Sequence, residues 1–156
     1  NMNDNQIKLL LRKVKTIAMI GISSEKKGED PKNLKRKPAN VVMTYMQKFG
    51  YKIYPINPYA VGEIINGEKV YGSLDKISEE IDLVDVFRPS KETPGIAKEA
   101  IKKNIKGLWL QYGIHSDEAE EIAKIKKIDF ISNKCIKQEY QRLFQQSNPV
   151  FPVLKD

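Results

Sequence analysis

Short apolar runs alternate along this chain with stretches in which apolar residues recur every three or four positions. The short runs are rich in β-branched and aromatic residues and end in polar or turn residues, a pattern typical of buried strands. Because helical stretches separate consecutive runs, the strands are expected to lie parallel in one sheet. We predict five strands, over residues 16–20, 51–56, 83–87, 107–111 and 128–132.

Helices are predicted between these strands from their apolar periodicity and their terminal residues. Thr93 and Ser116 are suited to cap two of the helices at their N-termini, and Gly50 is suited to close another. Together with the strands, the helices predict an α/β fold whose doubly wound, mostly parallel five-stranded sheet is the middle of three layers. The expected helices cover residues 3–13, 38–49, 94–104, 116–127 and 134–145.

One segment departs from the strand–helix order. Asn66-Gly67 stands between two short apolar runs, which is a strong signal of a two-residue β-hairpin. The length of 156 residues suits one domain with a single core. We expect a leading helix within 1–14, a core over 15–145 and a surface tail over 146–156.

The composition narrows the class of protein. A content of 40% hydrophobic and 30% charged residues excludes collagen-like, low-complexity and disordered chains. No apolar run approaches the roughly 18 to 20 residues that a membrane span needs, so a membrane is not an expected partner. The N-terminus lacks the order of a signal peptide, and the single cysteine, Cys135, cannot form an internal disulfide. A cytoplasmic location is expected.

The net charge of +7 is concentrated in the first part of the chain. Residues 1–60 hold 12 basic and 4 acidic side chains, whereas residues 61–156 hold 15 and 16. Within the first part, residues 26–37 place six basic side chains around two acidic ones. Such a segment focuses positive potential on an anion, although a solvated lysine-rich loop has the same composition.

Candidate binding residues follow from the predicted topology. In an open doubly wound sheet, the residues just after the strands line the binding crevice. Gly21 permits a tight exit from the first strand, and Ser23 and Ser24 offer hydroxyl and N–H donors for a phosphate. The residues in these positions are 21–24, 57–59, 88–90, 112–115 and 133–135.

Two features argue against a nicotinamide dinucleotide site. The glycine pattern G-x-G-x-x-G is missing after the first strand. At the end of the second strand, Asn57-Pro58 stands where an acidic residue usually binds the ribose hydroxyls. A loop of about 17 residues separates Gly21 from the next helix, far beyond the usual two to six. Because that loop is basic and leads to a helix N-terminus, it favours a ligand with several phosphates.

Six motifs, in order, resemble those of the small stand-alone CoA-binding proteins, whose fold looks like the N-terminal domain of the succinyl-CoA synthetase α-subunit. The resemblance extends from about residue 15 to residue 143 and implies a Rossmann-like fold. Compared with the family pattern, the first loop here is about nine residues longer, and Ala39 replaces a serine at the helix start. The motifs are IAMIGIS at 17–23, GYKIYPINP at 50–58, GEKVY at 67–71, IDLVDVFRPS at 81–90, LWLQYG at 108–113 and KCIKQEY at 134–140.

The resemblance, together with the positions at strand ends and helix starts, implies a set of ligand-binding residues. Gly21, Ser23 and Ser24 are expected at a phosphate turn, and Asn57-Pro58 beside the nucleotide. Cys135, at the start of the last helix, is expected near the pantetheine arm. The remaining candidates are Pro38, Ala39, Asn40 and Val41 at a helix start, Phe87, Arg88 and Pro89 after the third strand, and Gln111 and Gly113 after the fourth.

The expected function is the binding of coenzyme A or an acyl-CoA, without catalysis by this chain. A small-molecule nucleotide is the expected partner, and 156 residues leave no room for a phosphohistidine domain or an ATP-binding subunit. The alternatives are a nicotinamide-dependent reductase and a nucleic-acid-binding protein that uses residues 26–37. Nucleic acid is disfavoured because no aromatic residue interleaves the basic side chains. The oligomeric state is left open.

Three further residues are assigned from their surroundings. His115 is the only histidine and has no second ligand at metal-binding spacing, so neither a metal site nor a catalytic residue is expected. Trp109 stands among apolar residues and is expected in the core. Asp85 is expected to orient backbone groups or Arg88.

Overall fold

The computed structural model describes residues 1–26 and 37–145. Its centre is a five-stranded sheet with the order β2-β1-β5-β6-β7, in which every neighbouring pair is parallel. The predicted parallel sheet is therefore confirmed, with each strand within a residue or so of its expected ends. The strands are β1 (Thr16–Ile20), β2 (Lys52–Ile56), β5 (Leu83–Val86), β6 (Gly107–Leu110) and β7 (Asp129–Ile131).

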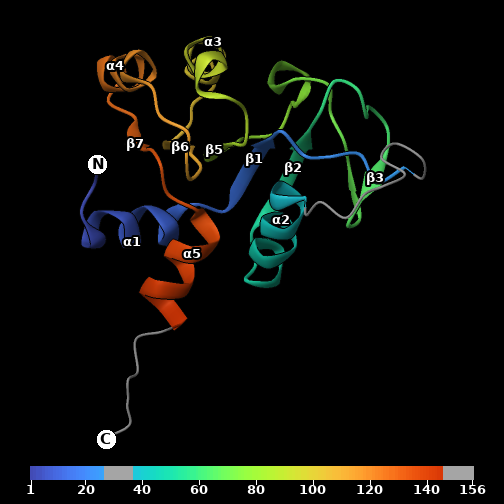
Figure 1. The fold of residues 1–156 in the computed structure, drawn as a ribbon, viewed down its shortest axis with the longest axis horizontal. Coiled ribbons are helices and arrows are strands. Elements are labelled where there is room, and N and C mark those ends of the chain that lie inside the picture. The colour runs from blue at the N-terminus through green and yellow to red at the C-terminus, as the bar shows by residue number, and fades with distance from the viewer. Residues whose placement is uncertain (27–36, 146–156) are drawn as a thin grey trace, which may run out of the picture.

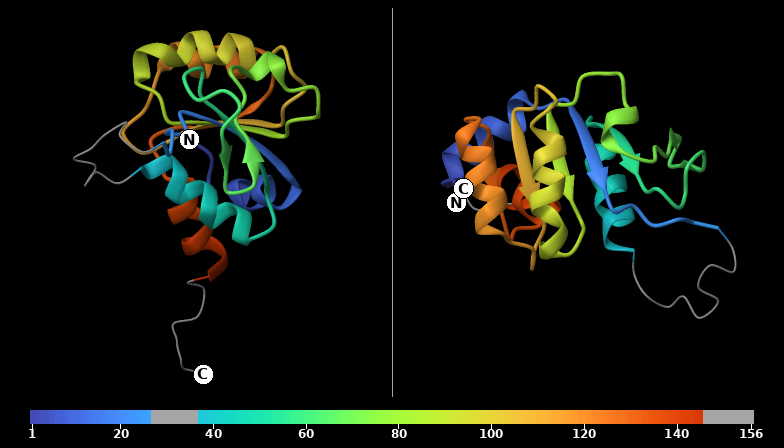
Figure 2. Two further views of the ribbon diagram at one scale, coloured as in Figure 1. Left: turned by 90° about the vertical axis from the view of Figure 1, so that its right-hand side faces the viewer. Right: turned by 90° about the horizontal axis from the view of Figure 1, so that it is seen from above.

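Helices cover both faces of the sheet, as the three-layer prediction requires. α3 (Thr93–Ala100) and α4 (Asp117–Ile125) lie over one face (Figure 1). The other face is covered by α1 (Asp4–Lys13), α2 (Pro38–Lys48) and α5 (Ile136–Tyr140), which continues as a π-helical turn, Gln141–Gln145. The left view of Figure 2 shows the sheet between the two helical layers.

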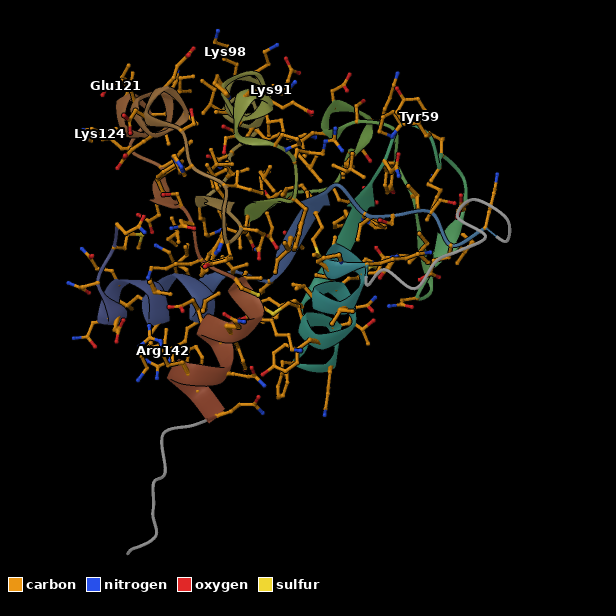
Figure 3. The ribbon with its side chains drawn as sticks, in the orientation of Figure 1. Tyr59, Lys91, Lys98, Glu121, Lys124 and Arg142 are labelled. Atoms are coloured by element: carbon orange, nitrogen blue, oxygen red, sulfur yellow. The ribbon has the colours of Figure 1, made fainter. Side chains whose placement is uncertain are left out.

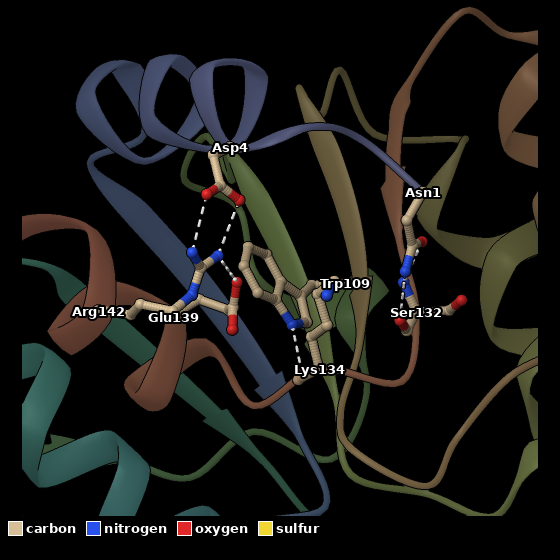
Figure 4. Close-up of polar contacts among 7 residues, drawn as sticks. All are labelled: Asn1, Asp4, Trp109, Ser132, Lys134, Glu139 and Arg142. Atoms are coloured by element: carbon tan, nitrogen blue, oxygen red, sulfur yellow. Dashed lines mark hydrogen bonds and ion pairs between the residues drawn. The ribbon is translucent and has the colours of Figure 1, made fainter.

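Alternate residues of each strand supply the two halves of the core. In β1, Ile17 and Met19 pack with α1, α2 and α5, whereas Ala18 packs with α3 and α4. Because both faces are covered, the strands are apolar almost throughout rather than alternating with polar residues. Trp109 is fully buried, as predicted, and its indole N–H donates to the Lys134 carbonyl at 2.7 Å (Figure 4).

Two helix ends differ from the prediction at α3. Thr93 is not an N-cap but the first residue of the helix, and its hydroxyl donates to the Ser90 carbonyl at 2.7 Å. A short 3-10 helix, η2 (Ser90–Glu92), precedes it, so the chain is already helical there. The helix ends at Ala100 instead of Asn104 because the following N–H groups return to nearer carbonyls. Ser116 caps α4 as predicted, accepting from the Ala119 N–H.

The predicted hairpin is present between β2 and β5. β3 (Ile64–Ile65) and β4 (Glu68–Lys69) pair antiparallel, and Asn66 and Gly67 both have positive φ, as a type I′ turn requires. We call residues 57–72 the excursion. Beyond it lies a 3-10 helix, η1 (Leu74–Lys76). The excursion extends past the β2 edge of the sheet (Figure 1).

The N-terminal segment is tied to the last strand and helix. Arg142 donates two hydrogen bonds of 2.8 Å to Asp4 and one of 2.7 Å to Glu139 (Figure 4). The Asn1 side-chain amide donates to the Ser132 carbonyl at 2.8 Å, joining the first residue to the end of β7. The expected tail over 146–156 and most of the basic segment 26–37 lie outside the described residues.

Candidate functional site

Two pockets lie at the carboxyl ends of the central strands. The α3-side pocket has a volume of about 630 Å³ and is formed by the ends of β1 and β2, the excursion and α3. The α5-side pocket has a volume of about 830 Å³ and is formed by the ends of β1, β5 and β6 with the starts of α2 and α5. Both volumes suit a sizeable organic ligand.

The two pockets meet where the strand order reverses. Gly21, Ser23 and Arg88 line both of them. Gly21 follows β1 and Arg88 lies two residues after β5, and β1 has β2 on one side and β5 on the other. This is the topological switch point at which open α/β sheets bind their ligands.

Gly21 is required for this junction by its geometry. Its φ of +109° lies in a region that residues with a Cβ rarely adopt. A Cβ added here would also stand 2.6 Å from the Phe87 carbonyl oxygen. The absence of a side chain therefore allows the chain to leave β1 close against the end of β5.

Two asparagines hold the turn that follows Gly21. The Ser23 N–H donates to the Asn40 Oδ1 at 2.9 Å, and the Asn40 Nδ2 donates back to the Ser23 carbonyl at 2.9 Å. The Asn57 Nδ2 donates to the Ile22 carbonyl at 2.7 Å. Asn40 is only 6% exposed. Both amides therefore fix the backbone of the turn.

The two serines of the turn have different surroundings. Ser24 is 3% exposed, and its hydroxyl donates to the Glu63 Oε2 at 2.5 Å. Its carbonyl accepts from the Lys37 ammonium at 2.8 Å. Ser23 lines both pockets, and its hydroxyl has no hydrogen-bond partner among the described residues. Ser23 is therefore the serine whose hydroxyl is open to a ligand.

Arg88 supplies positive charge to both pockets, but a carboxylate already pairs with it. Its Nε and Nη2 donate to the two oxygens of Glu92 at 3.0 and 2.8 Å. This pairing raises the pKa of the guanidinium. A ligand anion that reaches Arg88 has to compete with Glu92.

A buried polar pair lies on the sheet beside the α5-side pocket. Asp85 is 1% exposed, and its Oδ1 accepts from the Gln111 side-chain N–H. Its Oδ2 has no hydrogen-bond partner among the described residues, and burial raises its pKa to about 8. The Gln111 Oε1 accepts from the Ile136 N–H at 3.3 Å, which ties the pair to α5. Asp85 was expected to orient backbone groups or Arg88. It does not orient Arg88, which pairs with Glu92, whereas the Val86 backbone does contact the Asp85 carboxylate.

Most of the positions proposed from sequence line one pocket or the other. Tyr59, at the rim of the α3-side pocket, projects outward (Figure 3). Gly21, Ser23, Ser24, Asn57, Pro58 and Arg88 line the α3-side pocket, and Pro38, Ala39, Phe87, Gln111 and Cys135 are among those that line the α5-side pocket.

Asn40, Val41, Pro89 and Gly113 line neither pocket, and the same holds for Ser90, His115, Asn133 and Lys134 of the strand-end positions. Asn40 braces the turn, and Val41, one residue further along α2, is 38% exposed. Gly113 donates its N–H to the Asn133 side chain at 2.7 Å in a tight turn, and Pro89 precedes η2. These residues belong to the frame around the pockets rather than to their walls.

Several lining residues were not predicted. Ile96 and Glu99 of α3 line the α3-side pocket, and their spacing of three on a predicted helix is a signal that could have found them. Val42 and Gln138 line the α5-side pocket. Nothing local in the sequence marks Glu63, because its contact with Ser24 joins residues 39 positions apart.

Across residues 1–26 and 37–145, no group of three or more His, Cys, Asp or Glu side chains is arranged to hold a metal ion. In the same ranges, no helix is long and apolar enough to cross a bilayer.

Comparison with known proteins identifies the family. The model of the CoA binding domain matches residues 15–141 of this chain. The chain belongs to the CoA-binding domain family. That membership confirms the resemblance stated from the sequence motifs and supports an association with CoA.

Relatives of two sizes share this domain. A Bacillus subtilis protein, "Uncharacterized protein YneT", is 34% identical over 137 residues, which is 88% of this chain and 93% of that protein. The α subunit of an ADP-forming acetate–CoA ligase from Pyrococcus furiosus is 36% identical over 121 residues, which is 72% of this chain. This chain spans 23% of that subunit, and 17% and 16% of two further archaeal acetate–CoA ligases.

A solved structure from Thermus thermophilus, described as "cell-free ID.343", superimposes with a TM-score of 0.80 at 34% identity. The superposition covers 92% of this chain and all of the other. The Rossmann-like α/β fold is thus shared with stand-alone members of similar size.

Proposed function

We propose that this chain binds coenzyme A or an acyl-CoA at the carboxyl edge of β1, β2 and β5, and that it catalyses no reaction of its own. The observation that carries the proposal is the junction of two pockets at Gly21, Ser23 and Arg88, in a member of the CoA-binding domain family. CoA has a nucleotide end and a pantetheine end, and two joined pockets suit a ligand with two dissimilar halves.

The nucleotide is assigned to the α3-side pocket and the pantetheine arm to the α5-side pocket. The α3-side pocket presents the turn after β1 together with Asn57 and Pro58. The α5-side pocket is lined by Phe87, Ala39 and Val42, which offer apolar surface to an acyl or pantetheine chain, and by Cys135. Ser23 and Arg88, at the junction, are in place for the phosphates that join the two halves.

The surroundings of Asn57 favour CoA over a nicotinamide dinucleotide. Its Nδ2 donates to the Ile22 carbonyl, and its Oδ1 accepts from the Tyr59 N–H at 2.8 Å. Both polar ends of the side chain therefore have partners within the protein. In dinucleotide enzymes, an acidic residue at this strand end accepts hydrogen bonds from the ribose hydroxyls, and Asn57 does not supply that acceptor here.

The comparison with the acetate–CoA ligases supports ligand binding and transfers no catalytic step to this chain. The chain spans between 16% and 23% of the acetate–CoA ligases that it resembles. The matched part is the CoA-binding domain, so ligand binding is the one activity that the resemblance carries over.

The test is calorimetric titration of the purified chain with CoA, acetyl-CoA, NAD and NADP, preceded by native mass spectrometry of the protein as isolated. We expect CoA or acetyl-CoA to bind more tightly than either dinucleotide, or to copurify. Copurified nicotinamide cofactor, or NAD binding as tight as that of CoA, would support the reductase alternative. Turnover of acetyl-CoA by the chain alone would contradict the proposal that the chain catalyses no reaction of its own.

A further inference from the structure

The carboxylate of Glu63 lies against the turn that follows β1. Its Oε2 accepts from the Ser24 hydroxyl at 2.5 Å, and its Oε1 accepts from the Glu25 N–H at 3.2 Å. Glu63 belongs to the excursion, and Figure 1 shows the chain that leaves β1 passing beside β3. One carboxylate therefore takes two donors that directly follow Ser23, one of the two residues to which the proposed function assigns the phosphates.

The charges around Glu63 are those of an anion site. The Ser24 hydroxyl lowers the pKa of Glu63 most, and the Glu25 N–H and the positive charges of Lys26 and Lys37 lower it further. Lys37 reaches the same turn directly through the Ser24 carbonyl. A hydroxyl, a backbone N–H and two ammonium groups together suit the oxygens of a phosphate as well as those of a carboxylate.

The side chain of Glu63 can leave these donors without a change in its backbone. The Glu63 N–H donates to the Ala60 carbonyl at 3.1 Å, and the Glu63 carbonyl accepts from the Val70 N–H at 2.9 Å. These bonds hold the main chain within the excursion. The side chain is partly exposed, so rotation about its own bonds brings the carboxylate into water.

We propose that Glu63 is an internal anion, which occupies phosphate-binding donors in the free protein and is displaced by a phosphate of the ligand. The inference rests on the proposed function. On displacement, the phosphate oxygens accept from the Ser24 hydroxyl and the Glu25 N–H, and the Glu63 carboxylate turns to solvent. In the free protein, the Glu63 carboxylate partly neutralises the positive charges around the turn. A ligand group must bind these donors more strongly than a carboxylate does in order to displace it.

The test compares CoA binding by the wild type, Glu63→Gln and Glu68→Gln. Glu68 lies on the same hairpin and pairs with Lys52 at 2.7 Å, so its variant removes the same charge without touching the turn. Glu63→Gln is expected to bind CoA about fivefold more tightly, the size of a solvent-screened charge contact. Glu68→Gln is expected to bind within about twofold of the wild type.

A second variant separates displacement from a supporting role. Ser24→Ala removes the shared donor, so it is expected to weaken CoA binding and to abolish most of the gain when combined with Glu63→Gln. Thermal unfolding of each variant shows whether it is folded.

The outcomes distinguish the two proposals. If wild type binds CoA and Glu63→Gln binds it equally or more weakly, the internal-anion inference is overturned while the proposed function stands. An equal gain from Glu68→Gln overturns it as well, because the effect is then one of net charge. If neither wild type nor Glu63→Gln binds CoA, the proposed function is overturned, and the internal-anion inference, which rests on it, is overturned as well.

Discussion

The residues at the junction of the two pockets act there through different properties. Gly21 contributes the absence of a side chain, Ser23 an open hydroxyl, and Arg88 a fixed charge. Arg88 and Ser24 are both engaged by carboxylates, those of Glu92 and Glu63. The donors expected to meet a ligand anion are thus partly satisfied within the protein.

Arg88 is the side chain whose removal is expected to weaken CoA binding most. A hydrogen bond to a charged group contributes about 1.5 to 3 kcal/mol, and the competition with Glu92 reduces this. Arg88→Ala is therefore expected to weaken CoA binding about five- to tenfold in a calorimetric titration. Lys91→Ala is the matched control, because Lys91 is an exposed cation on η2 that lines neither pocket. Equal losses in both variants would show that Arg88 acts only through net charge.

In the proposed binding mode, Cys135 lies where the thiol end of the ligand is expected. It is partly buried and lines the α5-side pocket. When the protein is incubated with CoA disulfide, the Cys135 thiolate is expected to attack the disulfide, forming a protein–CoA disulfide and releasing one CoA thiol. Intact mass spectrometry should show one added CoA moiety that a reductant removes. An unmodified folded protein under conditions that modify the unfolded chain would indicate that the thiol is inert.

Asp85 is expected to make stability depend on pH. Its pKa is raised to about 8 in the folded protein, against about 3.9 in an unfolded chain. The folded state therefore holds a proton that the unfolded state has lost, so this contribution is full below pH 4 and is lost as pH rises towards 8. Asp85→Asn keeps the shape of the neutral side chain and removes the titration.

The measurement is the free energy of unfolding of the wild type and Asp85→Asn at pH 5, 6 and 7. Relative to the variant, the wild type is expected to lose up to about 1.4 kcal/mol per pH unit. Parallel pH profiles would mean that Asp85 is ionised in the folded protein.

At the scale of elements, local patterns predicted the strands and the hairpin, but not the contacts that shape the site. Asn66-Gly67 marks its turn by itself, because the left-handed backbone there suits those two residues. Asn40 was expected to meet the ligand from a helix start, whereas it braces Ser23 across 17 residues. Such contacts between distant segments leave no periodic signal. The early start of α3 has a local cause instead, because η2 directly precedes it and makes Thr93 an interior residue of a longer helical segment.

The role of the basic segment 26–37 remains a prediction from sequence, and the structure describes only its two ends, Lys26 and Lys37. Lys35→Ala, Arg36→Ala and Lys37→Ala combined are expected to weaken CoA more than dephospho-CoA, which lacks the 3′-phosphate. The binding free energy lost for CoA should exceed that lost for dephospho-CoA by about 0 to 1 kcal/mol if the lysines are solvated. The excess should be about 1.5 to 3 kcal/mol if they form well-ordered contacts. Lys98→Ala, Lys124→Ala and Lys126→Ala combined are the control, which removes three exposed cations from α3, from α4 and from the residue that follows α4. Unchanged discrimination would make the segment a solvated insertion.

At the scale of the molecule, the apolar periodicity was sufficient for the layers, because each strand is buried on both faces by helices that the sequence also marks. The apolar periodicity did not predict the number of pockets, because that number depends on how far α2, α3 and α5 stand from the strand ends.

Ligand binding is expected to raise the thermal midpoint of the whole molecule. CoA at a hundred times its Kd should stabilise the folded state by about 2.7 kcal/mol, which corresponds to a rise of roughly 5 to 10 °C for a chain of this size. Scanning calorimetry with CoA, NADP and no ligand measures this. A rise with NADP that equals the rise with CoA would contradict selectivity for CoA.

The burial of Trp109 has an optical consequence. It is the only tryptophan of the chain, and its indole is fully shielded from water and bonded to the Lys134 carbonyl, one residue before Cys135. The protein therefore contains a single indole fluorophore beside its seven tyrosines, and this indole, expected to emit at the short wavelengths of an apolar environment, is bonded next to the wall of the α5-side pocket. A change in its emission or quenching on addition of an acyl-CoA reports occupancy of that wall without any introduced dye.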